Sequence, residues 1–180
     1  MDSKLNKGIV GTLLLSLFCC PGFGDESTPA VMPLLKGYEW QFNPDQFRAL
    51  PADSYQELLR IAGSVDYPGY IRERALAALR IYPNDAVWSF MYGDLRNSTD
   101  IVRRRRLVEA MCAAFAGQRP RSVEDAIVNM LDSADAHLRV KVARCLGTLD
   151  SESAREQLDR YRSKITESWE AAAVDAKEIP

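Results

Sequence analysis

The chain has 180 residues and a mass of 20.2 kDa, which suits one domain of ordinary size. Hydrophobic residues make up 47% and charged residues 27%, a balance that excludes a wholly disordered chain and a polytopic membrane protein. The formal net charge is −2 and the chain has one histidine, so net charge gives no reason to expect nucleic-acid binding, and a multi-histidine metal or catalytic centre is excluded.

The first 24 residues follow the order of a secretory signal peptide. Two lysines precede an apolar run at residues 8–18, and its eleven residues are too few for a bilayer-spanning helix, which needs about 20. Gly22 and Gly24 are small residues at the −3 and −1 positions of a cut before Asp25. We therefore expect residues 1–24 to be a signal peptide that directs export, into the periplasm of a bacterium, and leaves a mature chain of net charge −3 without a transmembrane span.

The four cysteines bear on the compartment and on covalent structure. Leu17 lies three residues before Cys20, as in a bacterial lipoprotein box, although Cys19 stands where that box has a small residue; a lipid anchor on Cys20 is an alternative form of the mature chain. The other two, Cys112 and Cys145, can form one disulfide in an oxidising compartment. Both occupy apolar helix positions, and this pattern favours two buried free thiols over the bridge.

Residues 25–52 precede the regular part of the chain. Tyr38, Trp40 and Phe42 alternate with polar residues, which is typical of an extended segment with one apolar side. Asn43 then begins a short helix as its N-cap. We expect the segment to be a cap that covers the first repeat; the alternative is an arm that docks on a partner.

From residue 53 onwards the chain repeats itself. One apolar template with the spacing of a helix face occurs three times, at offsets of 33 and then 34 residues. Its copies are Ile71, Ala75, Ala78, Leu79 and Tyr82; Arg104, Val108, Met111, Cys112 and Phe115; and Leu138, Val142, Cys145, Leu146 and Leu149. A fixed period of this length predicts a tandem array of helix pairs, in which these segments are the inner helices.

The outer helix of each pair lies between these inner helices. The outer apolar stripes are at residues 55–62, 87–95, 123–131 and 158–165. The predicted N-caps are Ser54, Asn84, Ser122 and Ser153. No segment of this region has the pattern of a strand, so the sequence predicts an all-α fold in which stacked pairs bury one another's stripes.

The inner helices resemble a known family. The residues that carry the resemblance are Asp135, Leu138-Arg139, Val142-Ala143 and Leu146-Gly147, with Asp66, Ile71-Arg72 and Ala75-Leu76 in an earlier copy. They are similar to HEAT repeats of the short type seen in phycobilisome-lyase-like proteins. The resemblance implies a right-handed α-solenoid of about three pairs plus a half repeat over residues 53–165, with a C-terminal helix or tail at 166–180. It also implies a structural ladder between neighbouring units, formed by Asp66, Arg72, Arg105, Asp135 and Arg139.

Charge is distributed unevenly between the two sets of helices. The three inner segments sum to +8 and the three outer segments between residues 53 and 133 to −5. Because inner helices line the concave side of such solenoids, we expect a basic concave face that binds an acidic protein surface or an exported polyanion. Its candidate residues are Arg74, Arg80, Arg106, Glu109, Lys141 and Arg144.

No catalytic constellation stands out, and His137 lies in a turn without a nucleophile at motif spacing. We therefore expect no enzyme, no cofactor and no metal site, but an exported binding or scaffold protein that mediates protein–protein interaction. Two alternatives stay open. One is a lyase-like enzyme acting on a chromophore, and the other is a nucleic-acid-binding repeat protein, which the export signal disfavours.

Overall fold

The computed structural model describes residues 30–176, which form ten α-helices, one 3₁₀ helix and no strand. In chain order they are α1 (Met32–Leu35), α2 (Pro44–Arg48), α3 (Ser54–Gly63), α4 (Gly69–Leu79), α5 (Asp85–Asn97), α6 (Ile101–Phe115), α7 (Pro120–Ile127), η1 (Val128–Asp132), α8 (Ala136–Thr148), α9 (Glu152–Arg162) and α10 (Ser168–Asp175). The expected all-α class is confirmed. The predicted signal peptide and Cys20 lie outside the described residues.

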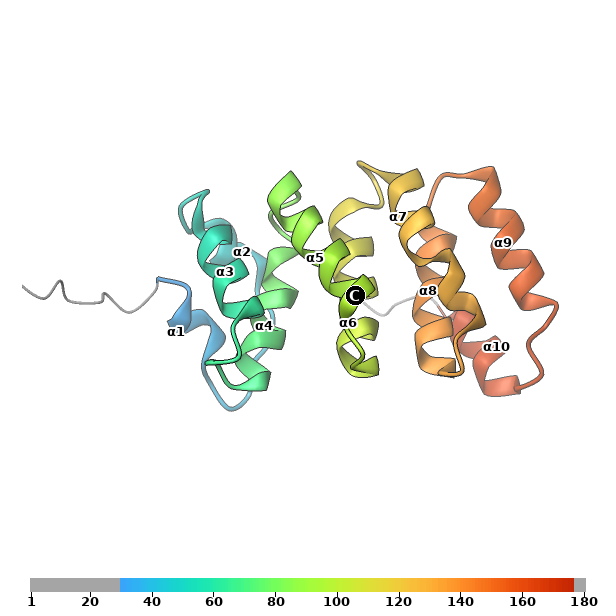
Figure 1. Ribbon diagram of the computed structural model, residues 1–180, viewed down its shortest axis with the longest axis horizontal. Helices are drawn as coiled ribbons and strands as arrows, with labels where there is room; N and C mark the ends of the chain where they lie inside the picture. The colour runs from blue at the N-terminus through green and yellow to red at the C-terminus, as the bar shows by residue number, and fades with distance from the viewer. Residues whose placement is uncertain (1–29, 177–180) are drawn as a thin grey trace, which may run out of the picture.

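The helices follow one another along the long axis of the molecule, from α1 at one end to α9 and α10 at the other (Figure 1). The even-numbered helices form a row in which α4 packs on α6, α6 on α8 and α8 on α10. The odd-numbered helices cover this row, with α3 against α4, α5 and α7 against α6, and α9 against α8. Within residues 30–176 no helix has both the length and the apolar character needed to cross a bilayer.

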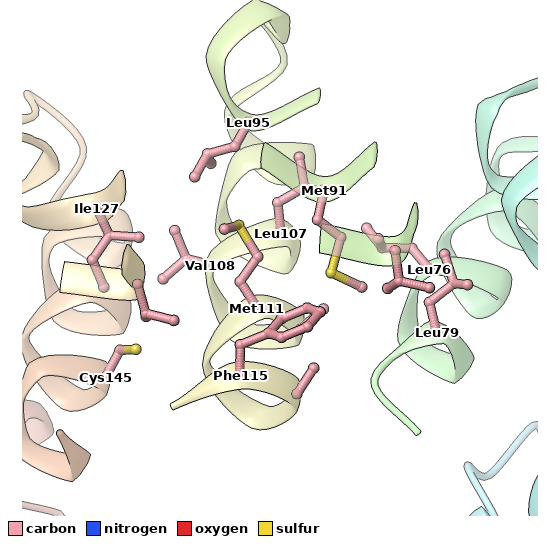
Figure 2. Packing of buried hydrophobic residues seen from close by; sticks show 14 of the residues in the cluster. Leu76, Leu79, Met91, Leu95, Leu107, Val108, Met111, Phe115, Ile127 and Cys145 are labelled. Carbon is pink, nitrogen blue, oxygen red and sulfur yellow. The ribbon is translucent and has the colours of Figure 1, made fainter. Parts of the chain in front are cut away.

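Helix α6 lies at the centre of the core. Its Leu107, Val108, Met111 and Phe115 are fully buried. Figure 2 shows α6 with buried side chains of α4 and α5 on one side and of α7 and α8 on the other. The template positions therefore face inward, as their spacing requires. Arg104, the one charged residue in the template, is partly buried, and its Nε has no hydrogen-bond partner within the described residues.

Some helix starts differ from the prediction. The N-caps Asn43 and Asn84 are confirmed, because each side chain accepts a backbone N–H of its own first turn at 3.0 Å. The predicted cap at Ser122 is wrong, because α7 already begins at Pro120, whose missing N–H and fixed φ suit a first helical position. Ser54 is the first residue of α3 and Ser153 lies inside α9, so these two predicted caps are also wrong.

The buried row makes a clear prediction for stability. Leu146 of α8 is completely buried, so Leu146→Ala removes apolar contacts and leaves a cavity. We expect a loss of about 2–5 kcal/mol in the free energy of unfolding, measured by urea denaturation. The matched control is Val102→Ala, an aliphatic truncation at a position 50% exposed, which should change stability by less than about 0.5 kcal/mol. Equal effects of the two variants would contradict this register.

Candidate functional site

Arginine–carboxylate pairs join successive even-numbered helices. Arg105 of α6 binds both carboxylate oxygens of Asp135, one from Nε at 2.9 Å and the other from Nη2. Asp135 is also the N-cap of α8, accepting the backbone N–H of Leu138 at 2.6 Å. The hydrogen bonds from Arg105 hold the pKa of Asp135 below its ordinary value. The Asp135 carboxylate thus caps the first turn of α8 and joins this helix to α6.

The next pair is more deeply buried. Arg139 of α8 donates to both oxygens of Glu170 in α10, at 2.9 and 2.8 Å, and to the carbonyl of Ser133 at 2.8 Å. Glu170 is 3% exposed and also accepts the hydroxyl of Tyr161 from α9. The Arg139 hydrogen bonds lower the pKa of Glu170, and burial together with the neighbouring carboxylate raises the pKa of Tyr161 to about 12. Three helices meet at this carboxylate.

The first step of the ladder differs from the expectation. Arg103 of α6 donates to Glu73 of α4 at 2.8 Å, to Asp94 of α5 at 2.7 and 2.9 Å, and to the carbonyl of Ala62 at 2.9 Å. Arg72 does not take this role, since its buried Nε lacks a hydrogen-bond partner in the described part of the chain. Within the described residues the hydrogen bonds of Asp66 stay in its own turn, with Ser64. The ladder prediction thus holds for Arg105, Asp135 and Arg139 and fails for the other two.

The Glu170 cluster predicts a pH dependence. Because the pKa of Glu170 is lower in the folded state, its contribution to stability is present above the unfolded pKa near 4.5 and is lost as the pH falls through the lower folded value. Glu170→Gln should cost about 2–3 kcal/mol at pH 7, measured by urea unfolding, and the difference from the native chain should shrink in acid.

The control is Glu167→Gln, an exposed residue whose side chain does not cap α10. This variant should keep the acid dependence of the native chain. If the unfolding free energy of Glu170→Gln differed from that of the native chain by the same amount at every pH, the assignment would be contradicted.

A cleft of about 640 Å³ opens beside the even-numbered row. Among residues 30–176, four cationic side chains line it, namely Arg80, Lys141, Arg144 and Arg162. We call it the cationic cleft. Two carboxylates also line it and pair with two of the cations: Glu109 accepts from Lys141 at 2.8 Å, and Asp175 from Arg162 at 2.8 Å. Among the described residues that line the cleft, cationic side chains outnumber carboxylates, a composition that suits an acidic ligand.

The floor of the cationic cleft is made of small side chains and a disulfide. Ala113, Ala143 and Gly147 line it together with Cys112 and Cys145. The two cysteines are bonded to each other, with Cα atoms 5.7 Å apart, so the expected pair of free thiols is wrong and the bridge forms. Cys112 is part-exposed rather than buried. Neighbouring stripe positions, the fourth of the template on α6 and the third on α8, therefore face each other, the geometry that a bridge needs.

The structure brings together four of the six predicted binding residues and separates two. Arg80, Glu109, Lys141 and Arg144 line the cationic cleft. Arg106 is exposed beside it, with its Nε 3.6 Å from Glu73. Arg74 lies elsewhere on α4, where its guanidinium donates to the carbonyls of Leu35 and Gly37. A side chain on the expected helix face, such as that of Arg74, can thus already be hydrogen-bonded to another part of the same chain.

Sequence reasoning missed Arg162 and Asp175, because they belong to α9 and α10, which lie beyond the clearest copies of the repeat. It also missed Glu170. The spacing carried a signal for that residue: Arg105 and its partner Asp135 are 30 residues apart, and Arg139 and Glu170 are 31 apart. A search for acids at this offset from each inner-helix arginine would have found it.

Comparison with protein-family models, with curated proteins and with solved structures found no match to this chain. Within residues 30–176 no group of three His, Cys, Asp or Glu side chains is placed to hold a metal ion.

The disulfide predicts a redox-dependent stability. It closes a segment with a sequence separation of 33, and the loss of chain entropy in the unfolded state corresponds to about 3–4 kcal/mol. In a chain with Cys19→Ser and Cys20→Ser, reductant should lower the unfolding free energy by up to that amount in urea titrations. When Cys112→Ser and Cys145→Ser are added to this chain, its unfolding free energy should be the same with and without reductant. Identical curves with and without reductant for the cysteine-containing chain would contradict the bridge.

Proposed function

We propose that this protein is an exported HEAT-like α-solenoid that acts as a binding module and holds an acidic segment of a partner protein in the cationic cleft. The observation that carries the proposal is the cleft itself, where Arg80 at the C-terminal end of α4, Lys141 and Arg144 of α8 and Arg162 at the end of α9 come together. Side chains converging on one concave, partly apolar space are typical of a binding site.

The packing supports the repeat architecture. Successive even-numbered helices contact each other, and the Arg105–Asp135 and Arg139–Glu170 pairs recur at nearly the same spacing between them. A unit that repeats its contacts with each neighbour is the physical definition of a solenoid. The all-helical structure is compatible with HEAT-like pairs as the repeating unit.

Export is supported by the N-terminal sequence and by the disulfide. The order of basic start, apolar run and small-residue cleavage site is that of a signal peptide. A disulfide between Cys112 and Cys145 persists in oxidising compartments and is reduced in most cytosols. Intact mass of the secreted protein tests this proposal, and a retained Met1 would overturn it.

The alternatives have less support. A lyase-like enzyme that attaches a chromophore through a thiolate needs a free cysteine, and Cys112 and Cys145 are bonded to each other. A nucleic-acid interface on the arginine run would need that run exposed, but Arg103 and Arg105 are engaged in inter-helix ion pairs.

The test uses charge reversal inside and outside the cationic cleft. The double variant Lys141→Glu, Arg162→Glu should weaken binding of a fluorescein-labelled decapeptide of alternating Glu and Ser by about tenfold or more, measured by fluorescence anisotropy. Binding to the native protein should also weaken as salt rises, since the Debye length is about 8 Å near physiological ionic strength.

The control is the double variant Arg121→Glu, Arg155→Glu, which makes the same change in net charge at exposed positions of α7 and α9. It should bind the peptide nearly as well as the native chain. Equal weakening by both pairs of substitutions would mean that net charge acts without a defined site, and no weakening by either would overturn the proposal.

A further inference from the structure

Residues 36–43 are a non-helical segment that crosses α4. The guanidinium of Arg74 donates to the carbonyls of Leu35 and Gly37, both at 2.9 Å. The same guanidinium lies 5.2 Å from the ring centre of Trp40, a cation–π contact. The end of α1 and the non-helical segment after it therefore already bind one of the chain's own helix arginines, through backbone acceptors and an aromatic ring.

The next contact of this segment reaches the cationic cleft. The ring of Phe42 lies 3.8 Å from the guanidinium carbon of Arg80, and Arg80 lines the cationic cleft. Phe42 also stacks on Phe47 of α2, with ring centres 5.7 Å apart, which holds it in place. The segment thus ends at the near edge of the cleft, and the cations beyond it continue the same face.

The floor of the cationic cleft is suited to a flat ring. Ala113, Ala143 and Gly147 have at most a methyl side chain, so a planar group can approach the helices closely. The sulfur atoms of Cys112 and Cys145 add a polarizable surface, and sulfur makes favourable contacts with aromatic rings. Around this floor stand the cations, which attract both carboxylates and ring faces.

We infer that the cationic cleft binds an extended peptide segment that carries aromatic side chains next to acidic ones, in the manner of the chain's own residues 36–43. This inference rests on the proposed function and adds the chemistry of the partner. The rings lie on the small-residue floor and against the cations, as Trp40 and Phe42 lie against Arg74 and Arg80. The acidic side chains of the segment bind cations of the cleft wall such as Arg80 and Lys141.

The experiment compares three fluorescein-labelled pentapeptides on the full, disulfide-bonded chain. The first has the order Glu-Trp-Gln-Phe-Asp, the second replaces both rings by alanine, and the third replaces both acids by their amides. We expect the first to bind best. Loss of the two rings should weaken binding by about tenfold, and loss of the two acids should weaken it and remove its salt dependence.

A variant of the protein tests whether the peptide binds in the cationic cleft. Ala113→Trp puts a bulky ring into the cationic cleft from an exposed position on α6, and it should abolish binding of the first peptide. The matched control is Ala86→Trp, at an exposed position in the first turn of α5, which should bind normally. Unchanged thermal midpoints establish that both variants fold, and the peptide comparison needs no variant at all.

The outcomes separate the two proposals. If the alanine peptide binds as tightly as the aromatic one, or if Ala113→Trp binds normally, this inference is overturned while an acidic partner stands. If the aromatic peptide fails to bind where the acidic decapeptide binds, the inference is likewise overturned. If neither peptide binds and charge reversal changes nothing, the proposed function fails with it.

Discussion

Burial of each apolar stripe between two neighbouring helices is the constraint on which the structure depends. The α6 side chains Leu107, Val108 and Met111 have no exposed surface, and no single helix pair could enclose them. The helices must therefore continue in a row, and both ends of the row need covering. Phe47 and the buried residues of α1 do this at one end, and Glu170 with Val174 of α10 at the other.

The same constraint produces the cationic cleft. Large apolar side chains are used on the buried sides of α6 and α8, which leaves small residues such as Ala113 and Gly147 on the open side, with charges such as Lys141 beside them. A hollow with a cationic wall follows from that division. The bond between Cys112 and Cys145 lies at its floor and holds α6 against α8, so the shape of the hollow depends on the relative position of only a few helices.

The repeat could be read from the sequence because packing acts at fixed spacing. Template positions such as Leu79, Met111 and Leu146 are all fully buried. The roles of single charges could not be read in the same way. In a run of four arginines each points about 100° from the last, so the inward pairing of Arg103 depends on where Glu73 and Asp94 lie in space. The cleft likewise draws on helices distant in sequence, which periodicity alone does not place together.

The disulfide has a mechanical consequence. If the chain were pulled from its two ends, the segment between Cys112 and Cys145 could not extend, because force would pass through the sulfur–sulfur bond instead of along the backbone. The sequence separation is 33, so at about 3.3–3.6 Å per extended residue the bond shortens the fully stretched chain by about 110 Å. The segment closed by the disulfide runs from the last turn of α6 through α7 to α8. Under such a force this segment would thus stay closed after the parts of the chain outside it had unfolded.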